Sequence, residues 1–204
     1  MQRTWNVSSH LLLEGNHSLL DGLTKQITGP KGLDAGFGPG AIDVAELASR
    51  GLDIMGVDSV QANWDVAVSM HPSIRNRLQV ADLSQPLDFP DAEFDFVLCN
   101  AVIQHINPVL VESTTLPEFA RILKENGILQ LTFKCGSGTI STKDSDYDEV
   151  RHFQLFDEVW IVKVLLHNGM ELVEAKSTDS LGGLMYFTNQ VNLKHCALWA
   201  RKIH

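Results

Sequence analysis

Glycines and acids in the first half of the chain are spaced in a way that suits a ligand containing a ribose. The segment 32–41 reads GLDAGFGPGA, with three glycines in five residues. Because glycine weakens helix and strand interiors, this cluster indicates a sharp turn or a close approach of the backbone to a ligand. Asp58 follows Gly36 by 22 residues, a spacing at which a carboxylate accepts hydrogen bonds from both ribose hydroxyls. Asp82, in the run VADL, is placed to reach an adenine edge.

Alternating strands and helices would bring these groups together. Short apolar runs without polar alternation are typical of strands buried on both faces, and they predict strands over 52–58, 77–83, 94–101 and 127–134. Helical spacing predicts helices over 41–51, 111–127 and 157–168. This alternation favours a parallel sheet with helices on both faces, whose ligands bind at the carboxyl ends of the strands. In this interpretation Asp34, Asp58 and Asp82 end three successive strands.

The last third of the chain departs from this alternation. A stretch rich in Gly, Ser and Asp predicts a mobile loop able to close over a substrate. Strands expected over 170–178 and 195–202 follow without an intervening helix, which indicates an antiparallel hairpin. We interpret 1–204 as one domain with four parts: an N-terminal helical cap or lid (1–28), a cofactor-binding half (29–135), a mobile insert (136–152), and a C-terminal helix and hairpin (153–204).

Composition excludes several classes of partner. The formal net charge is -9 and there is no run of Lys or Arg, which argues against nucleic acid. No stretch approaches the roughly 18 apolar residues of a membrane span. Cys99, Cys135 and Cys196 lack CxxC pairing, which indicates free thiols in a reducing compartment and no metal site. We therefore expect a cytoplasmic protein.

The sequence resembles the class I S-adenosylmethionine-dependent methyltransferases over most of its length. Their motif Asp-x-Gly-x-Gly-x-Gly is matched by residues 34–40, and their second-strand and third-strand acids are matched by Asp58 and Asp82. FDFVLCNAVIQHI is similar to their fourth strand and its turn, and PEFARILKENGILQLTF to the helix and fifth strand. Phe37 stands where the family commonly has a small residue or Cys. The resemblance implies a Rossmann-like, seven-stranded, mostly parallel sheet with one antiparallel C-terminal strand.

The resemblance also implies which residues hold the cofactor, S-adenosyl-L-methionine, and its product S-adenosyl-L-homocysteine. The glycine loop and Asp34 would surround the methionine part, Asp58 would hold the ribose, and Asp82 with the Leu83 amide would bind adenine. The implied cofactor-binding residues are Asp34, Gly36, Phe37, Gly38, Gly40, Asp58, Ser59, Val60, Asp82, Leu83, Asn100 and Ala101.

Methyl transfer requires a nucleophile held in line with the departing sulfur, and orientation alone supplies about 7–11 kcal/mol of the barrier. An oxygen or nitrogen nucleophile also needs a base, for which His105, His152 and Tyr147 are candidates. The fourth strand ends in CNAV and lacks the Asn/Asp-Pro-Pro-aromatic signature of enzymes that methylate DNA bases or glutamine. A small metabolite with an O, N, S or C acceptor is therefore the expected substrate.

Three alternatives stay open. Gly36-x-Gly38-x-x-Ala41 also fits the dinucleotide fingerprint, so an NAD(P)-dependent oxidoreductase is one. The second is a protein that binds the cofactor without turnover, and the third is an enzyme that keeps the cofactor but performs another reaction. The oligomeric state does not follow from the sequence.

Overall fold

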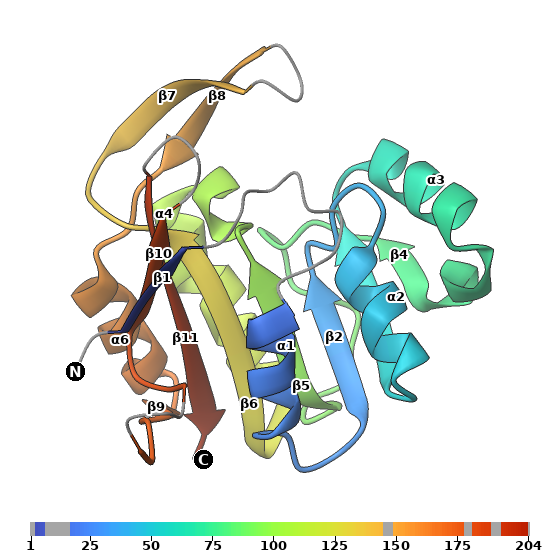
Figure 1. The fold of residues 1–204 in the computed structure, drawn as a ribbon, viewed down its shortest axis with the longest axis horizontal. Coiled ribbons are helices and arrows are strands. Elements are labelled where there is room, and N and C mark those ends of the chain that lie inside the picture. The colour runs from blue at the N-terminus through green and yellow to red at the C-terminus, as the bar shows by residue number, and fades with distance from the viewer. Residues whose placement is uncertain (1–2, 7–16, 145–148, 178–180, 189–192, 204) are drawn as a thin grey trace.

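A twisted sheet forms the middle of the molecule, and helices cover both of its faces (Figure 1). The computed structural model describes residues 3–6, 17–144, 149–177, 181–188 and 193–203. The helices are α1 (His17–Thr24), α2 (Ile42–Ser49), α3 (Gln61–Met70), η1 (Pro72–Arg77), η2 (Ile103–His105), α4 (Pro108–Leu110), η3 (Val111–Thr115), α5 (Leu116–Ile122) and α6 (Glu158–His167).

Nine strands of the described residues form the central sheet, and two form a separate hairpin. The central strands are β1 (Arg3–Asn6), β2 (Lys31–Ala35), β3 (Asp53–Asp58), β4 (Leu78–Val80), β5 (Phe94–Asn100), β6 (Leu123–Lys134), β9 (Met170–Leu172), β10 (Met185–Thr188) and β11 (Lys194–Lys202). Their order is β1-β10-β11-β6-β5-β2-β3-β4, and β9 also pairs with β11. The separate hairpin consists of β7 (Thr139–Asp144) and β8 (Glu149–Gln154).

The sheet confirms the expected fold class. Strands β2 to β6 are parallel to one another, whereas β11 is antiparallel to β6, β9 and β10. Because β9 and β10 pair with opposite ends of β11, they share one position, and the sheet has seven positions from there to β4. Strand β1 adds a further strand beside β10.

Residues of alternate parity along each strand build two cores. Val97 and Leu129 face the side covered by α5 and α6, where Phe119 and Ile161 meet them. Leu98, one residue on, faces the side of α1 and α2. Strands β5 and β6 are therefore buried on both faces, which explains why their sequences show no polar alternation.

The polar segment 136–152 does not form the expected loop. Strands β7 and β8 pair in register from Thr139 with Gln154 to Asp144 with Glu149. Ile140 lies opposite Phe153, a β-branched and aromatic pair of the kind that stabilises antiparallel strands. The composition was misleading because Thr and Val favour strands even among polar neighbours. Figure 1 shows this hairpin standing above the carboxyl ends of the central strands.

The helix expected to continue to Gly127 ends earlier, at Ile122. Leu123 already pairs with Phe94, and the next pair joins Phe96 to Ile128. Residues 124–127 therefore form a bulge in which Asn126 has a φ of 64°, so Asn126-Gly127 marks a strand irregularity and not a helix end.

The N-terminal segment was expected to be a helical cap, but residues 3–6 form strand β1. Helix α1 buries Leu19, Leu20 and Leu23 against the sheet. The leucines at 11–13 lie outside the described residues. The antiparallel pairing expected between 170–178 and 195–202 is present, since β9 pairs with Ala200–Lys202 of β11. The pattern did not indicate β10, which pairs with the first residues of β11.

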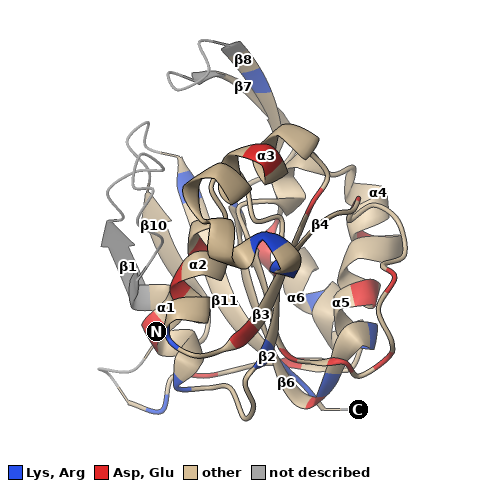
Figure 2. Cartoon of the chain, turned by 90° about the vertical axis from the view of Figure 1, so that its right-hand side faces the viewer, with Lys and Arg blue, Asp and Glu red and all other residues tan. Residues whose placement is uncertain are grey.

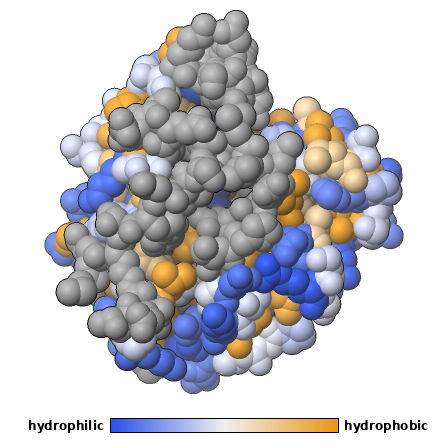
Figure 3. All heavy atoms as spheres, viewed as in Figure 1, coloured by the Kyte–Doolittle hydropathy of each residue, from blue (hydrophilic) through white to orange (hydrophobic). Residues whose placement is uncertain are grey.

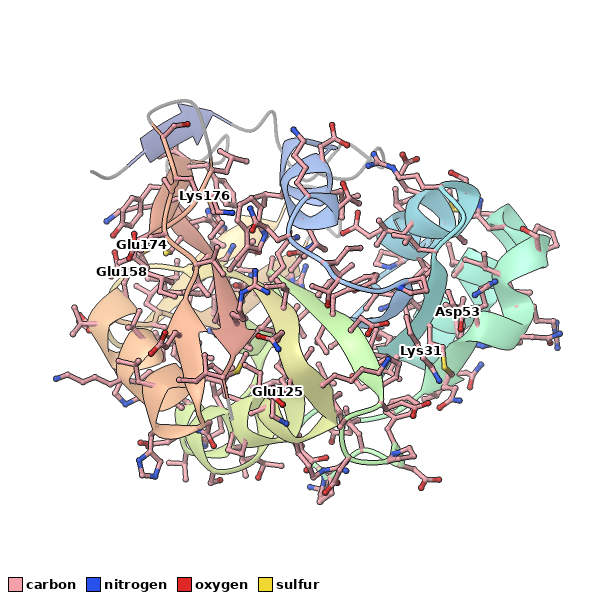
Figure 4. All side chains as sticks on the ribbon, turned by 90° about the horizontal axis from the view of Figure 1, so that it is seen from below. Lys31, Asp53, Glu125, Glu158, Glu174 and Lys176 are labelled. Atoms are coloured by element: carbon pink, nitrogen blue, oxygen red, sulfur yellow. The ribbon has the colours of Figure 1, made fainter. Side chains whose placement is uncertain are left out.

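Charges at the amino ends of the central strands are paired with one another. Lys31 pairs with Glu93, Lys124 Nζ lies 2.8 Å from Asp95 Oδ1, and Arg77 Nη1 lies 3.0 Å from Asp53 Oδ1. Figure 4 views the molecule from this edge, with Lys31 and Asp53 labelled at the starts of β2 and β3. Each of these carboxylates is paired with a cation from a neighbouring segment.

Candidate cofactor and active site

The glycine loop after β2 follows a backbone path that favours glycine. Gly36, Gly38 and Gly40 have φ values of 99°, 61° and 106°. Gly36 N donates to Val57 O at 2.7 Å, and Gly38 N donates to Asp58 Oδ2 at 2.9 Å. Because these two amides are already used, the loop contributes space and a fixed path for a ligand more than it contributes donors.

Substitution at two loop glycines should have very different effects. A Cβ on Gly36 would lie 2.3 Å from Val102 Cγ2, whereas a Cβ on Gly38 would meet nothing within 4 Å. Both positions have positive φ, so each substitution costs about 1 kcal/mol of backbone strain. We expect Gly36→Ala to cost several further kcal/mol through the steric clash. Thermal unfolding of the two variants measures this, and equal losses would contradict the packing described here.

Asp58, at the end of β3, is held by three hydrogen bonds. Its Oδ2 accepts from Gly38 N, and its Oδ1 accepts from Val60 N at 2.9 Å and from Asn63 Nδ2 at 3.1 Å. The residue is 8% exposed, so one side of the carboxylate still borders open space. The carboxylate thus joins the glycine loop to the start of α3 and stays oriented before any ligand arrives.

A cavity of about 300 Å³ opens at the carboxyl ends of β2, β3 and β5. This volume is at the lower end of the range for small-molecule sites. Five residues expected from the sequence to bind cofactor line it, namely Gly36, Asp58, Ser59, Asp82 and Leu83. The other lining residues are Ser84, Val102, His105, Ile106, Asn107 and Leu110. Asp82 Oδ1 accepts from Ser84 N at 2.8 Å, which turns the chain along the cavity wall.

Asp34, near the end of β2 and just before the glycine loop, is buried near the carboxylates of Asp43 and Asp58. The residue is 3% exposed, and burial raises the pKa of its carboxyl well above the ordinary value. The negative charges of Asp43 and Asp58 raise this pKa further. A cationic ligand group at this position would be attracted by all three carboxylates.

The turn after β5 is held by hydrogen bonds to Thr132 of the neighbouring strand β6. Ala101 has a φ of 58°, and its N–H donates to Thr132 O at 3.0 Å and to Thr132 Oγ1 at 2.8 Å. Asn100, which precedes it, donates from Nδ2 to Asp43 Oδ2 at 2.9 Å. Asn100 therefore lies beside the acidic group at the start of α2.

Phe37 occupies the core and not the cavity. It is 7% exposed and belongs to the cluster that includes Val44 and Leu47 of α2. A Cβ on Gly56 would lie 3.0 Å from Phe37 Cδ1, so β3 leaves room for the ring by having glycine there. Val60 follows Ser59 and is 48% exposed.

Among the candidate bases, His105 lies at the cavity. Its ring packs against Phe153 of β8, with centroids 5.1 Å apart, and Arg151 Nη2 lies 3.4 Å from its Nε2. A guanidinium only donates, so Nε2 is the acceptor and Nδ1 carries the proton. Although one side of the ring is exposed, partial burial together with the charges of Arg151 and Lys134 lowers the pKa of His105 to about 4. His105 is therefore neutral at physiological pH.

The other two candidates are less favourably placed or not described. His152 is exposed, and its Nδ1 lies 2.8 Å from Ser141 Oγ on β7. Because successive residues of a strand point to opposite sides, His152 faces away from the side on which Arg151 and Phe153 meet His105. Tyr147 lies outside the described residues.

Two polar residues at the site were not anticipated. Asn63 bonds to Asp58 from the first turn of α3, and Asp43 bonds to Asn100 from the first turn of α2. The position of Asp43 could have indicated a site residue, because an acid in the first helical turn after the glycine loop lies near the carboxyl ends of the strands. Nothing in the sequence separates Asn63 from an ordinary surface residue.

The described residues were searched for a metal site and for a membrane-spanning helix. Within these ranges no group of three or more His, Cys, Asp and Glu residues is arranged to hold a metal ion. Likewise, no helix in them is long and apolar enough to cross a membrane. Cys99, Cys135 and Cys196 are free thiols.

The strand order and the helices on both faces of the sheet form the methyltransferase fold. Residues 33–131, just under half of the chain, match the family model described as a methyltransferase domain.

One curated protein and two solved structures illustrate what the chain is similar to. The chain is 30% identical over 135 residues to the biotin biosynthesis bifunctional protein BioHC of Cellvibrio japonicus, a match covering 66% of the chain but only 26% of that longer protein. The 1,6-didemethyltoxoflavin-N1-methyltransferase of Burkholderia thailandensis, solved with its substrate and S-adenosylhomocysteine, has the same fold, with a TM-score of 0.65 at 17% identity over 95% of this chain and 79% of that one. The [4+2]-cyclase SpnF also shares it, with a TM-score of 0.64 at 17% identity over 91% and 81%.

Proposed function

We propose that this protein is an S-adenosylmethionine-dependent methyltransferase that acts on a small-molecule metabolite by in-line displacement. The observation that carries the proposal is the placement of Asp34, Asp58 and Asp82 around one end of the sheet, with Asp58 and Asp82 in the cavity wall. Three differently placed carboxylates match the ammonium, the ribose hydroxyls and the adenine edge of one cofactor. The match of residues 33–131 to the methyltransferase-domain family supports the same cofactor.

Each part of the cofactor has a proposed partner. Asp58, already oriented by backbone amides, receives the ribose hydroxyls, and Asp82 with Leu83 and Ser59 surrounds the adenine. Asp34 and the turn at Asn100-Ala101 receive the methionine end. Gly36, Gly38, Gly40, Phe37 and Val60 shape the loop around these contacts.

The acceptor is proposed to enter between η2 and the β7–β8 hairpin. His105 lines the cavity there, whereas His152 faces away from His105, so position favours His105 over His152 as the candidate base. Orientation supplies most of the acceleration for an acceptor that needs no base. The similar structure from Burkholderia thailandensis, an N1-methyltransferase with bound 1,6-didemethyltoxoflavin, supports a small-molecule substrate.

A small molecule remains the proposed partner in preference to nucleic acid. On the face shown in Figure 2, described Lys and Arg residues are scattered among Asp and Glu and do not gather into one basic surface. Apolar residues reach the surface around α3, on the right of Figure 3, where Val66 and Met70 are each 44% exposed. We also propose, from the sequence, that the protein is cytoplasmic and that residues 1–28 act as a lid over the cofactor.

One experiment distinguishes the methyltransferase from two other functions, an NAD(P)-dependent oxidoreductase and a protein that uses the cofactor without methyl transfer. Isothermal titration calorimetry with S-adenosylmethionine, S-adenosylhomocysteine, NAD and NADP should show micromolar binding of the sulfur cofactors alone. Selective binding of NAD or NADP would make the oxidoreductase the leading interpretation. If the sulfur cofactors bind but no O, N, S or C acceptor is methylated in a screen, the protein uses the cofactor for something other than methyl transfer. The [4+2]-cyclase SpnF has the same fold and is named for a different reaction.

A further inference from the structure

A chain of hydrogen bonds between side chains crosses the sheet from β11 to the first turn of α2. Trp199 Nε1 donates to Gln130 Oε1 at 2.9 Å, and Gln130 Nε2 donates to Asn100 Oδ1 at 3.1 Å. Asn100 Nδ2 then donates to Asp43 Oδ2 at 2.9 Å. The chain thus joins β11, β6, β5 and α2, of which the last follows the glycine loop.

The direction of this chain is fixed by its two ends. The indole N–H of Trp199 only donates, so Gln130 must turn its carbonyl oxygen toward it. The amide nitrogen of Gln130 then faces Asn100, which must in turn present its oxygen to Gln130 and its nitrogen to Asp43. At the far end Asp43 Oδ2 accepts from Asn100 Nδ2. Each amide therefore has a single satisfactory orientation.

The starting point of the chain is held firmly. Trp199 and Gln130 are both 0% exposed. Helix α1 packs directly on the indole, because a Cβ on Gly22 would lie 2.2 Å from Trp199 Cη2. A buried donor or acceptor left without a partner is costly, so the amides of Gln130 and Asn100 have little freedom to turn over.

We infer that Gln130 and Trp199 are positioning residues for the amino-acid end of the cofactor. They act through Asn100, which holds the Asp43 carboxylate beside Asp34, and these two carboxylates receive the α-ammonium of the cofactor. Asp43 thereby becomes a cofactor-binding residue. The inference rests on the proposed function, since it names how the methionine end of that same site is recognised.

Two ligands separate positioning from general stability. S-adenosylhomocysteine carries the amino-acid end, whereas 5′-methylthioadenosine has the adenosine and sulfur but lacks it. We expect Gln130→Met, which keeps the length of the side chain and removes its hydrogen bonds, to weaken S-adenosylhomocysteine binding about tenfold. Binding of 5′-methylthioadenosine should change less than twofold. Titration calorimetry of both ligands gives the comparison.

A matched control is available on the same strand. Leu131 is buried on the opposite face of β6, so Leu131→Val perturbs packing without touching the chain of hydrogen bonds. It should leave the ratio of the two affinities unchanged. Trp199→Phe, which keeps an aromatic ring but removes the N–H, should lower the ratio about threefold and serves if Gln130→Met does not fold.

The outcomes are distinguishable. Equal weakening of both ligands, or no weakening of S-adenosylhomocysteine, would overturn the positioning role. Failure of the unmodified protein to bind either ligand would instead overturn the proposed function, and the inference with it.

Discussion

Replacing Asp34 by Asn is expected to stabilise the free protein and, at the same time, to weaken its binding of S-adenosylhomocysteine. Burial and the charges of Asp43 and Asp58 raise the pKa of this carboxyl, so ionising it is unfavourable in the folded protein. Asparagine has nearly the same shape without the charge. At pH 8 the variant should therefore melt at a higher temperature than the unmodified protein.

The loss of affinity has the opposite cause. The cofactor ammonium would lose a charge-assisted hydrogen bond worth about 1.5–3 kcal/mol, or roughly 10–150-fold in Kd. Binding of 5′-methylthioadenosine should be nearly unaffected. Calorimetric melting and titration of the two proteins test both halves, and a variant that loses stability as well as affinity would mark Asp34 as a structural residue.

The same carboxyl predicts a pH dependence of stability. A group whose pKa is higher in the folded than in the unfolded state binds more protons when folded, so its contribution to stability falls as pH rises from the unfolded pKa, near 4, through the folded pKa. This slope should be smaller in the Asp34→Asn variant. Proton release on binding of S-adenosylhomocysteine, detected in buffers of different ionisation enthalpy, should likewise be smaller in the variant.

Replacing Asp58 by Ala should have the largest effect on cofactor binding. The substitution removes the proposed acceptor of the ribose hydroxyls and also frees Gly38 N and Val60 N, which anchor the glycine loop and the start of α3. Charge-assisted hydrogen bonds contribute about 1.5–3 kcal/mol each, so we expect Kd for S-adenosylhomocysteine to rise at least 100-fold. Since both ligands contain ribose, 5′-methylthioadenosine should weaken to a similar extent.

Asn63→Ala provides the control for Asp58. It removes one bond to the same carboxylate, the 3.1 Å contact from Nδ2, and leaves the two backbone donors in place. Its effect on Kd should stay within about fivefold. An Asp58→Ala variant that keeps its affinity for both ligands would place the ribose elsewhere.

The parts of the site that are local in sequence could be predicted. The glycine loop and the acids at the ends of β2 and β3 follow from short motifs whose geometry is set by a single strand and turn, and the fold class followed from alternating elements. The structure confirms the sheet. It leaves the roles of these residues as predictions that the substitutions above will test.

Features that depend on distant partners could not be predicted. Asp43 and Asn100 are separated by 57 residues, and Gln130 and Trp199 by 69, so no local pattern links them. The β7–β8 hairpin was hidden because a polar strand pair outside the main core lacks an apolar run. The end of α5 at Ile122 depends on the bulge against β5, which only strand pairing reveals.

Strand β11, the last of the described strands, is inserted between strands that precede it in the chain, and this order affects folding during synthesis. Strand β11 lies between β6 and the shared position of β9 and β10, although it follows all of them in the chain. Because a ribosome releases the chain from its N-terminal end, β6 keeps an unpaired edge until residues 194–202 have emerged. That exposed edge invites pairing with other nascent chains. The hydrogen bond from Trp199 Nε1 to Gln130 Oε1 therefore forms only late in synthesis.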